Sequence, residues 1–377
     1  FGLLKKYTEK WLVVPGANAA TLQNDLLCGE GDLESTEPTK CLMRMASFVD
    51  NGPSDFRSWF LSASTQELRA EVSMPVRSEG FSPQFLDFID RYGFRCVNEL
   101  KLEALDLHDD PSFALQAVQS YVRMKSYSVA AMEVREKEIR SRAEAILHER
   151  LSGLRLLAYS WILKNTRKAV KNRENLRFDR TKIFGVVRQL MRGIGRRLEE
   201  LGQLDQASDI FYLTVDEIHS FIEGRGLHAH LAPVARMRRV EFTSYEQGMA
   251  PPDRFSTNGA AGAAFAFPLL LADSDLLKHV PSASDDPNML VGTSCCPGSI
   301  EGVVRVVRSM ADAENLNGEI LVTERTDPGW VPLYPSCSGL VIERGSLLSH
   351  SAVVARELGL PTIVGVSGGL MKRLKTG

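Results

Sequence analysis

The sequence predicts a multidomain protein with α and α/β parts, in which a mainly helical domain is followed by a small domain built from β-strands and a helix. Three observations support this. Apolar residues recur at helical spacing over residues 1–249. Residues 250–290 are rich in Gly, Ala, Pro and Ser, as linkers and irregular segments are. Short β-branched runs then alternate with turn residues. We therefore predict a helical domain at 1–249, a linker or irregular subdomain at 250–290, and an α/β domain at 291–377.

The composition describes an ordinary globular protein without a global charge bias. The chain has 377 residues, of which 44% are hydrophobic and 24% charged, with a formal net charge of −2. These values give no argument for a nucleic-acid partner or an anionic membrane. The longest apolar stretch, residues 260–271, is shorter than the ~20 residues that cross a bilayer. Six cysteines without CxxC or metal-ligand spacing predict reduced thiols, a cytoplasmic location and no metal site.

Within the helical part, residues 53–69 predict a helix whose packing residues include Trp59, Phe60, Leu61 and Leu68. Ser82 is predicted to cap a second helix, which ends at Gly93. Arg95 and Glu99 follow closely. We interpret this pair as a structural ion pair or, alternatively, as a contact to a substrate.

Residues 164–197 concentrate lysine and arginine on a predicted long helix. Its apolar residues repeat at heptad-like steps and are expected to face the core: Phe184, Val187, Met191, Ile194 and Leu198. On the next stripe Arg188, Arg192 and Arg196 stand four residues apart, which costs repulsion unless acidic side chains or an anionic ligand compensate it. No aromatic residues are interleaved with them for stacking on nucleic-acid bases. The candidate substrate-binding arginines of the segment are Arg173, Arg177 and Arg188.

After this helix, residues 209–213 predict an extended apolar segment, and Thr214 with Glu217 predicts a capping box rather than a catalytic pair. His228 and His230 lie in a turn without carboxylate or cysteine neighbours. We do not interpret them as metal ligands.

One histidine stands between a strand, a small-residue turn and a helix. Residues 339–342 are apolar and β-branched, and residues 350–358 carry an apolar helical face that Gly359 and Pro361 end, with Arg356 and Glu357 on its polar side. A helix start offers unpaired N–H groups and positive potential to a phosphoryl group, and neutral imidazole is a competent nucleophile. His350 is therefore a candidate phosphate carrier, and the alternative is a capping or buried histidine. We expect its side chain to be exposed and to contribute little packing.

The context of His350 resembles a known signature. Residues 345–361, with small residues, His350, Ala355-Arg356 and Gly359-x-Pro361, resemble the phosphohistidine segment of the phosphoenolpyruvate-utilising enzymes. Residues 294–305 and 318–322 resemble the first two strands of that mobile domain. The resemblance implies a swivelling phosphohistidine domain, here C-terminally incomplete, with His350 as the catalytic carrier. Supporting residues follow from it: Gly345, Ser346 (where many members have glycine), Ser349, Ser351 and Arg356, together with the loop residues Thr326, Asp327, Pro328 and Trp330.

The order of the parts narrows the resemblance. A helical domain before the mobile domain, and the segment around Arg95 and Glu99, are similar to rifampicin phosphotransferase-like proteins. This implies a cytoplasmic transferase in which His350 passes a phosphoryl group from ATP to a small-molecule acceptor held by the helical domain. The ATP-grasp domain that binds ATP and Mg²⁺ is expected on the same polypeptide or on a separate chain, because the sequence has no glycine-rich nucleotide loop. Since Phe1 is not preceded by Met, we expect the chain to be a piece of a longer protein.

Other functions remain open at this point. The same architecture resembles an ATP-dependent condensing enzyme of the prodigiosin-synthetase kind and phosphoenolpyruvate synthase (pyruvate, water dikinase). A docking module without catalytic activity is a third interpretation. In the enzymatic cases, a hinge within residues 250–290 would let the histidine domain move between two sites.

Overall fold

A computed structural model describes residues 2–12, 19–29, 33–77, 80–125, 128–248, 286, 289–296, 298–308, 310–313, 316–347, 349–367 and 369–377. The chain forms two compact units. The first takes in residues 1–100, 104–182 and 281–377, and the second residues 101–103 and 183–280. The predicted domain boundaries at 249 and 290 stay predictions, and almost all of the predicted linker 250–290 lies outside the described residues.

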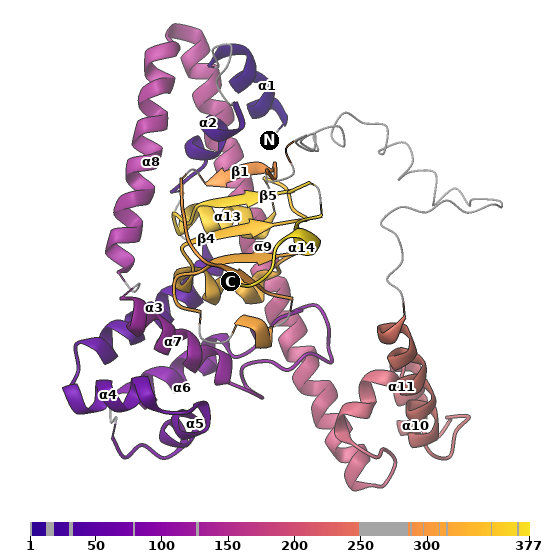
Figure 1. Cartoon of the computed structure of the whole chain (residues 1–377). Helices are drawn as coiled ribbons and strands as arrows, with labels where there is room; N and C mark the ends of the chain where they lie inside the picture. The colour runs from indigo at the N-terminus through magenta and orange to yellow at the C-terminus, as the bar shows by residue number, and fades with distance from the viewer. Residues whose placement is uncertain are drawn as a thin grey trace, which may run out of the picture. The chain divides into compact units, whose positions relative to one another are not determined.

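The helical part of the first unit consists of two groups (Figure 1). Its elements are α1 (Gly2–Trp11), α2 (Ala19–Leu26), η1 (Glu34–Thr36), α3 (Glu37–Asp50), α4 (Ser54–Ser62), α5 (Thr65–Ser73), α6 (Phe81–Tyr92), α7 (Ser112–Met124), α8 (Val129–Arg150) and the 48-residue helix α9 (Gly153–Glu200). None of the described helices is long and apolar enough to cross a membrane.

Helices α3 to α7 pack around an aromatic core. Phe60, Phe81 and Phe85 are almost fully buried, and the Phe60 and Phe81 rings meet edge to face with centroids 5.0 Å apart. The predicted packing residues Phe60 and Leu68 lie in this core, and Gly93 ends α6 as predicted. The predicted cap is wrong: Gly80 holds the N-cap position, and Ser82 is the second residue of α6, with its hydroxyl donating to the Glu71 carbonyl.

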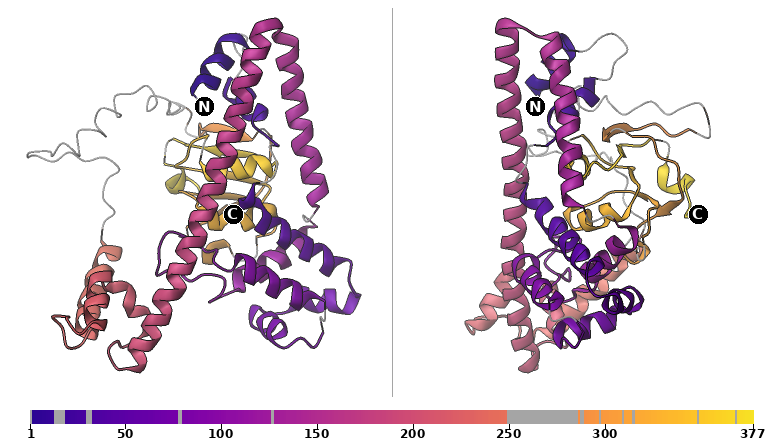
Figure 2. Two further views of the ribbon diagram at one scale, coloured as in Figure 1. Left: turned by 180° about the vertical axis from the view of Figure 1, so that it is seen from behind. Right: turned by 90° about the vertical axis from the view of Figure 1, so that its left-hand side faces the viewer.

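Helices α8 and α9 form the long hairpin seen from both sides in Figure 2. Two helices therefore cover residues 134–170, and Gly153 at their junction has a φ of 57°, which glycine adopts without strain. Helices α1 and α2 pack against the hairpin through a small apolar core that includes Leu4, Leu26 and Tyr159. This arrangement gives α9 a rigid backing.

The second unit comprises the end of α9 with η2 (Ala207–Tyr212), α10 (Val215–Ile222) and α11 (Ala232–Gln247), around Leu198, Ile210 and Ile218. The Thr214 and Glu217 capping box is confirmed. Two expectations are wrong. Residues 209–213 lie mostly in the 3₁₀ helix η2 rather than an extended segment, since short apolar runs do not distinguish the two. Val187 is 37% exposed while Arg188 is fully buried, so the buried stripe of α9 is rotated from the one predicted.

The C-terminal α/β part is a five-stranded sheet in the order β1-β5-β4-β3-β2. Its elements are β1 (Thr293–Cys296), β2 (Val304–Val306), η4 (Met310–Ala313), β3 (Ile320–Thr323), η5 (Pro328–Ser336), β4 (Gly339–Ile342), α13 (His350–Glu357), β5 (Thr362–Val364) and α14 (Leu370–Arg373). The β1–β5 pair is antiparallel and the other pairs are parallel.

One face of the sheet packs on α13 and η5, with Leu321, Leu340 and Ile342 in the core, and the other packs on α14. The expectation of one strand over residues 294–305 is wrong, because β1 ends at Cys296 and β2 begins at Val304, at opposite edges of the sheet. The predicted fold class, a mainly helical part followed by a small swivelling-type α/β domain, is confirmed.

Candidate active site around His350

Local chain geometry places His350 at the first position of α13. Strand β4 buries Leu340 and Ile342, the chain turns through Gly345 and Ser346, and α13 begins at His350. Ser349 is the N-cap: its backbone is extended, and its hydroxyl accepts a hydrogen bond from the Ala352 N–H at 3.4 Å. The predicted order of strand, small-residue turn and helix is therefore confirmed.

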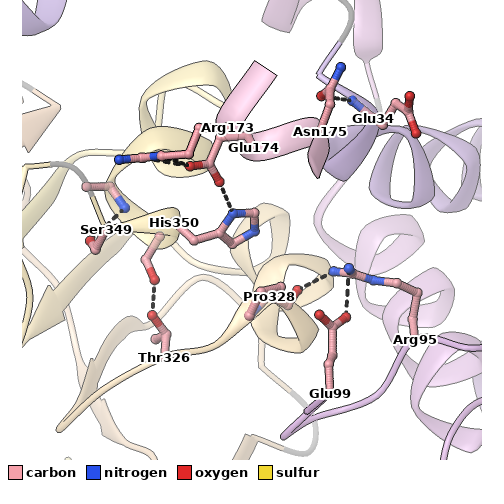
Figure 3. A network of polar contacts seen from close by, with 12 residues as sticks. Glu34, Arg95, Glu99, Arg173, Glu174, Asn175, Thr326, Pro328, Ser349 and His350 are labelled. Carbon is pink, nitrogen blue, oxygen red and sulfur yellow. Dashed lines mark hydrogen bonds and ion pairs between the residues drawn. The ribbon is translucent and has the colours of Figure 1, made fainter. Parts of the chain in front are cut away.

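His350 is buried, contrary to the expectation of an exposed side chain. It is 5% exposed because α9 covers it, and its Nδ1 atom lies 2.7 Å from Oε2 of Glu174, which is itself fully buried (Figure 3). The two residues are 176 positions apart in the chain. The pairing therefore joins the α/β domain to the long helix.

Burial and hydrogen bonding set the charge of this pair. Burial is the largest effect on Glu174 and raises its pKa, but hydrogen bonds from His350 and Arg173 outweigh it and lower the pKa to about 2. Burial is also the largest effect on His350 and lowers its pKa, which Glu174 raises back only in part. Glu174 is therefore ionised and His350 neutral near pH 7. With Nδ1–H donating to Glu174, the lone pair of the ring lies on Nε2.

The Nε2 atom of His350 is buried and meets no hydrogen-bond partner within the described part of the chain. Three arginines act on the pair. Arg173 holds the other oxygen of Glu174 at 2.6 Å, and Arg95 and Arg177 are near enough to lower the pKa of His350. The Nε atom of Arg177 is also buried and has no hydrogen-bond partner among the described residues. Arg95 is paired with Glu99, so Arg177 adds positive charge near the ring, which suits a phosphoryl group.

Arg95 and Glu99 form the predicted ion pair at 2.7 Å, and both side chains are buried. Arg95 also donates from Nη2 to the carbonyl oxygen of Pro328 at 2.6 Å (Figure 3). The pair thus connects the helical part to the loop that precedes η5.

That loop holds the first turn of α13. The hydroxyls of Thr326 and Ser351 are hydrogen-bonded, and Asp327 caps η5 by accepting from the Gly329 N–H at 2.8 Å. Burial raises the pKa of Asp327, against two backbone hydrogen bonds that lower it. Trp330 is buried in the domain core. Four of the predicted loop residues therefore lie in one connected structure next to His350.

Other predicted site residues lie elsewhere. Arg356 follows His350 by six residues, about 120° around the helix, and lies close enough to Asp25 to affect its pKa. Both Arg356 and Glu357 are buried rather than on an open polar face, because α2 and α8 pack there. Arg188 belongs to the second unit, where Nη2 donates to the Lys101 carbonyl at 3.0 Å. Their roles toward phosphate or substrate stay predictions.

Glu174 was missed in the sequence interpretation. It is an acidic residue inside a basic segment, flanked by Arg173 and followed by Arg177. A single carboxylate within a basic helical segment is a usable sequence signal, because it indicates that this position has a specific hydrogen-bonding or ionic partner. No group of three metal-ligating side chains occurs among the residues that the structure describes.

Comparison with known proteins defines the class to which this fold and site belong. Residues 316–377 match the family model described as "PEP-utilising enzyme, mobile domain", and residues 1–174 match "Rifampicin phosphotransferase fourth domain". The chain therefore carries a part similar to the mobile domain of the phosphoenolpyruvate-utilising enzymes, preceded by a part similar to the fourth domain of rifampicin phosphotransferase. It is thus rifampicin phosphotransferase-like, related to enzymes of the phosphotransferase kind.

The relatives include three proteins named rifampicin phosphotransferase. The one from Streptomyces sviceus is 31% identical over 287 residues, which is 74% of this chain and 31% of that protein. One from another Streptomyces is 33% identical over 290 residues, 75% of this chain and 31% of that protein. The Bacillus subtilis protein is 29% identical over 290 residues, 74% of this chain and 31% of that protein. The chain thus matches about a third of the length of these relatives.

Proposed function

We propose that this chain is the carrier and acceptor part of a phosphotransferase, in which His350 Nε2 takes a phosphoryl group and passes it to a hydroxyl of a small molecule. The observation that supports this most is the His350–Glu174 pair. Glu174 binds the Nδ1 proton at 2.7 Å, so the ring lone pair is directed away from the carboxylate. Nε2 is buried, has no hydrogen-bond partner among the described residues, and belongs to a ring on which Arg95 and Arg177 act.

The chemistry follows from these positions. In the first step Nε2 attacks phosphorus, an N–P bond forms, and the P–O bond to the donor breaks. Ionised Glu174 stabilises the positive charge that develops on the ring, because its oxygen is already hydrogen-bonded to Nδ1–H. In the second step the acceptor hydroxyl oxygen attacks phosphorus, its proton passes to solvent, and the N–P bond breaks, so that His350 regains the Nε2 lone pair and is neutral again. Arg177, whose Nε has no partner among the described residues, would donate to the phosphoryl oxygens in both steps, and Arg95 adds positive charge nearby.

We propose that the phosphoryl donor binds outside the described residues. ATP with Mg²⁺ needs a phosphate-cradling loop and carboxylate ligands, and the described residues gather no such ligand group. An ATP-grasp domain, on the same polypeptide or a separate chain, would supply both. The acceptor would be a small molecule bound by the helical part, as the name of the Streptomyces and Bacillus relatives suggests for those proteins.

The test uses the complete gene product, together with its ATP-grasp partner if that is encoded separately. Wild type and His350→Ala are incubated with ATP labelled at the β or the γ phosphate, with rifampicin and other hydroxyl-bearing compounds as acceptors. Wild type should transfer β label through an acid-labile protein intermediate, and His350→Ala should give neither intermediate nor product. Equal labelling of both proteins would refute the carrier role. Label from the γ position alone would refute the β-phosphoryl route.

A further inference from the structure

One contact between the helical part and the α/β domain combines two side chain–backbone hydrogen bonds with a close approach of the two backbones. Residues 95–98 lie shortly after α6. Residues 327–329 are the N-cap and the first two residues of η5, more than 200 positions later in the chain. Arg95 donates to the Pro328 carbonyl at 2.6 Å, and the Asn98 N–H donates to Oδ2 of Asp327 at 2.9 Å. The two short segments therefore contact each other through consecutive or nearly consecutive residues on both sides.

Gly329 lies at the closest point of this contact. A Cβ atom built on it would come within 2.1 Å of the Cys96 carbonyl oxygen and 2.8 Å of the Val97 Cα. These are backbone atoms, which cannot rotate away as a side chain can. Gly329 is not among the described glycines with positive φ, so an alanine fits its own backbone conformation. The glycine is needed for the approach of the two segments and not for the fold of its own domain.

The partner segment is shaped for the same contact. Asn98 has a φ of 60°, a left-handed conformation that asparagine tolerates better than most residues. This conformation presents the Asn98 N–H to Asp327. The Nη1 atom of Arg95 lies 2.7 Å from the Glu99 carboxylate, and its Nη2 atom donates to the Pro328 carbonyl oxygen. The ion pair thus orients the guanidinium toward Pro328.

We propose that residues 95–98 are a docking surface whose partner is the loop 327–329 of the α/β domain, and that this latch holds His350 in its closed position against Glu174. Gly329 sets the specificity of the latch, because any side chain there separates the two backbones. The consequence for catalysis rests on the proposed function: loss of the latch would uncouple His350 from the acceptor side without touching the histidine. The docking itself can be tested without any phosphoryl transfer.

The experiment measures how fast diethyl pyrocarbonate modifies His350 in the purified chain, followed by peptide mass spectrometry. In the closed state the ring is 5% exposed and should react slowly. Gly329→Ala and Gly329→Val should raise the His350 rate by about tenfold or more, because the rate follows the population of the open state. Gly302→Ala is the matched control, since a Cβ there meets nothing closer than 3.9 Å. It should react as wild type does.

A second pair of variants tests the other side of the latch. Asn98→Pro removes the N–H and excludes the left-handed conformation, while Asn98→Gly keeps both. Asn98→Pro should raise the modification rate of His350, and Asn98→Gly should leave it as slow as in wild type. Near-ultraviolet circular dichroism, to which buried Trp330 contributes with the other aromatic residues, checks in each case that the chain keeps its packed fold. If His350 stays protected in both Gly329→Val and Asn98→Pro, the latch is refuted, whether or not His350 proves to carry phosphate.

Discussion

Replacing Glu174 is the sharpest test of how the buried pair works. Glu174→Gln keeps the size of the side chain and an oxygen that can accept from Nδ1–H, but removes the negative charge. A buried charge-assisted hydrogen bond such as this one, 2.7 Å long, contributes about 1.5–3 kcal/mol. At about 1.4 kcal/mol per factor of ten, the variant should form phosphohistidine roughly 10 to 150 times more slowly. Glu174→Ala should be slower still, because Arg173 also loses its partner.

Two measurements separate this positioning role from a loss of stability. A quenched time course gives the rate of acid-labile labelling, and ¹⁵N NMR of histidine-labelled protein gives the tautomer of His350. The wild-type ring should be protonated on Nδ1, and Glu174→Ala should shift the proton toward Nε2. Glu144→Gln is the control, because Glu144 is also paired with arginines, Arg140 and Arg167, on the helical hairpin. Unchanged labelling rate and tautomer in both Glu174 variants would refute the mechanism.

Further predictions concern charge and stability. Burial and the nearby Glu357 raise the pKa of Glu136 from 4.5 to about 8, so the folded chain holds an extra proton and stability should fall as pH rises through this interval. In urea unfolding, Glu136→Gln should remove that slope, and an unchanged slope would contradict the assignment. Arg356→Ala should slow phosphoryl transfer without abolishing it, whereas His350→Ala should abolish it. Complete loss of labelling in Arg356→Ala would contradict this. Thr214→Ala should cost about 1 kcal/mol of unfolding free energy through the lost cap, whereas Thr214→Ser should cost little.

The sequence predicted those parts of the site that depend on neighbouring residues. Strand, turn and helix around His350 follow from periodicity and from Ser349 and Gly359, which act within a few positions. The Arg95–Glu99 ion pair, four residues apart, was accessible for the same reason. The family signature added the catalytic interpretation of the histidine, which periodicity alone does not provide.

The parts that were missed depend on contacts between distant segments. Glu174 meets His350 across 176 positions, and burial of the histidine follows from that contact and not from the sequence around it. The buried stripe of α9 was placed wrongly because a heptad rule selects apolar side chains. Fully buried Arg188 instead donates to the Lys101 carbonyl, which compensates its charge. The close approach at Gly329 leaves no pattern in the sequence beyond the glycine itself.

The central claim is that His350 carries the phosphoryl group on Nε2. The most direct measurement is to map the phosphorylated residue and ring atom in the complete gene product, by mass spectrometry of peptides under basic conditions and ³¹P–¹⁵N NMR. The chain has seven histidines, and the six other than His350 serve as internal controls. We predict phosphate on His350 alone and on Nε2 alone. Phosphate on Nδ1, or on another histidine such as His228, would contradict the account.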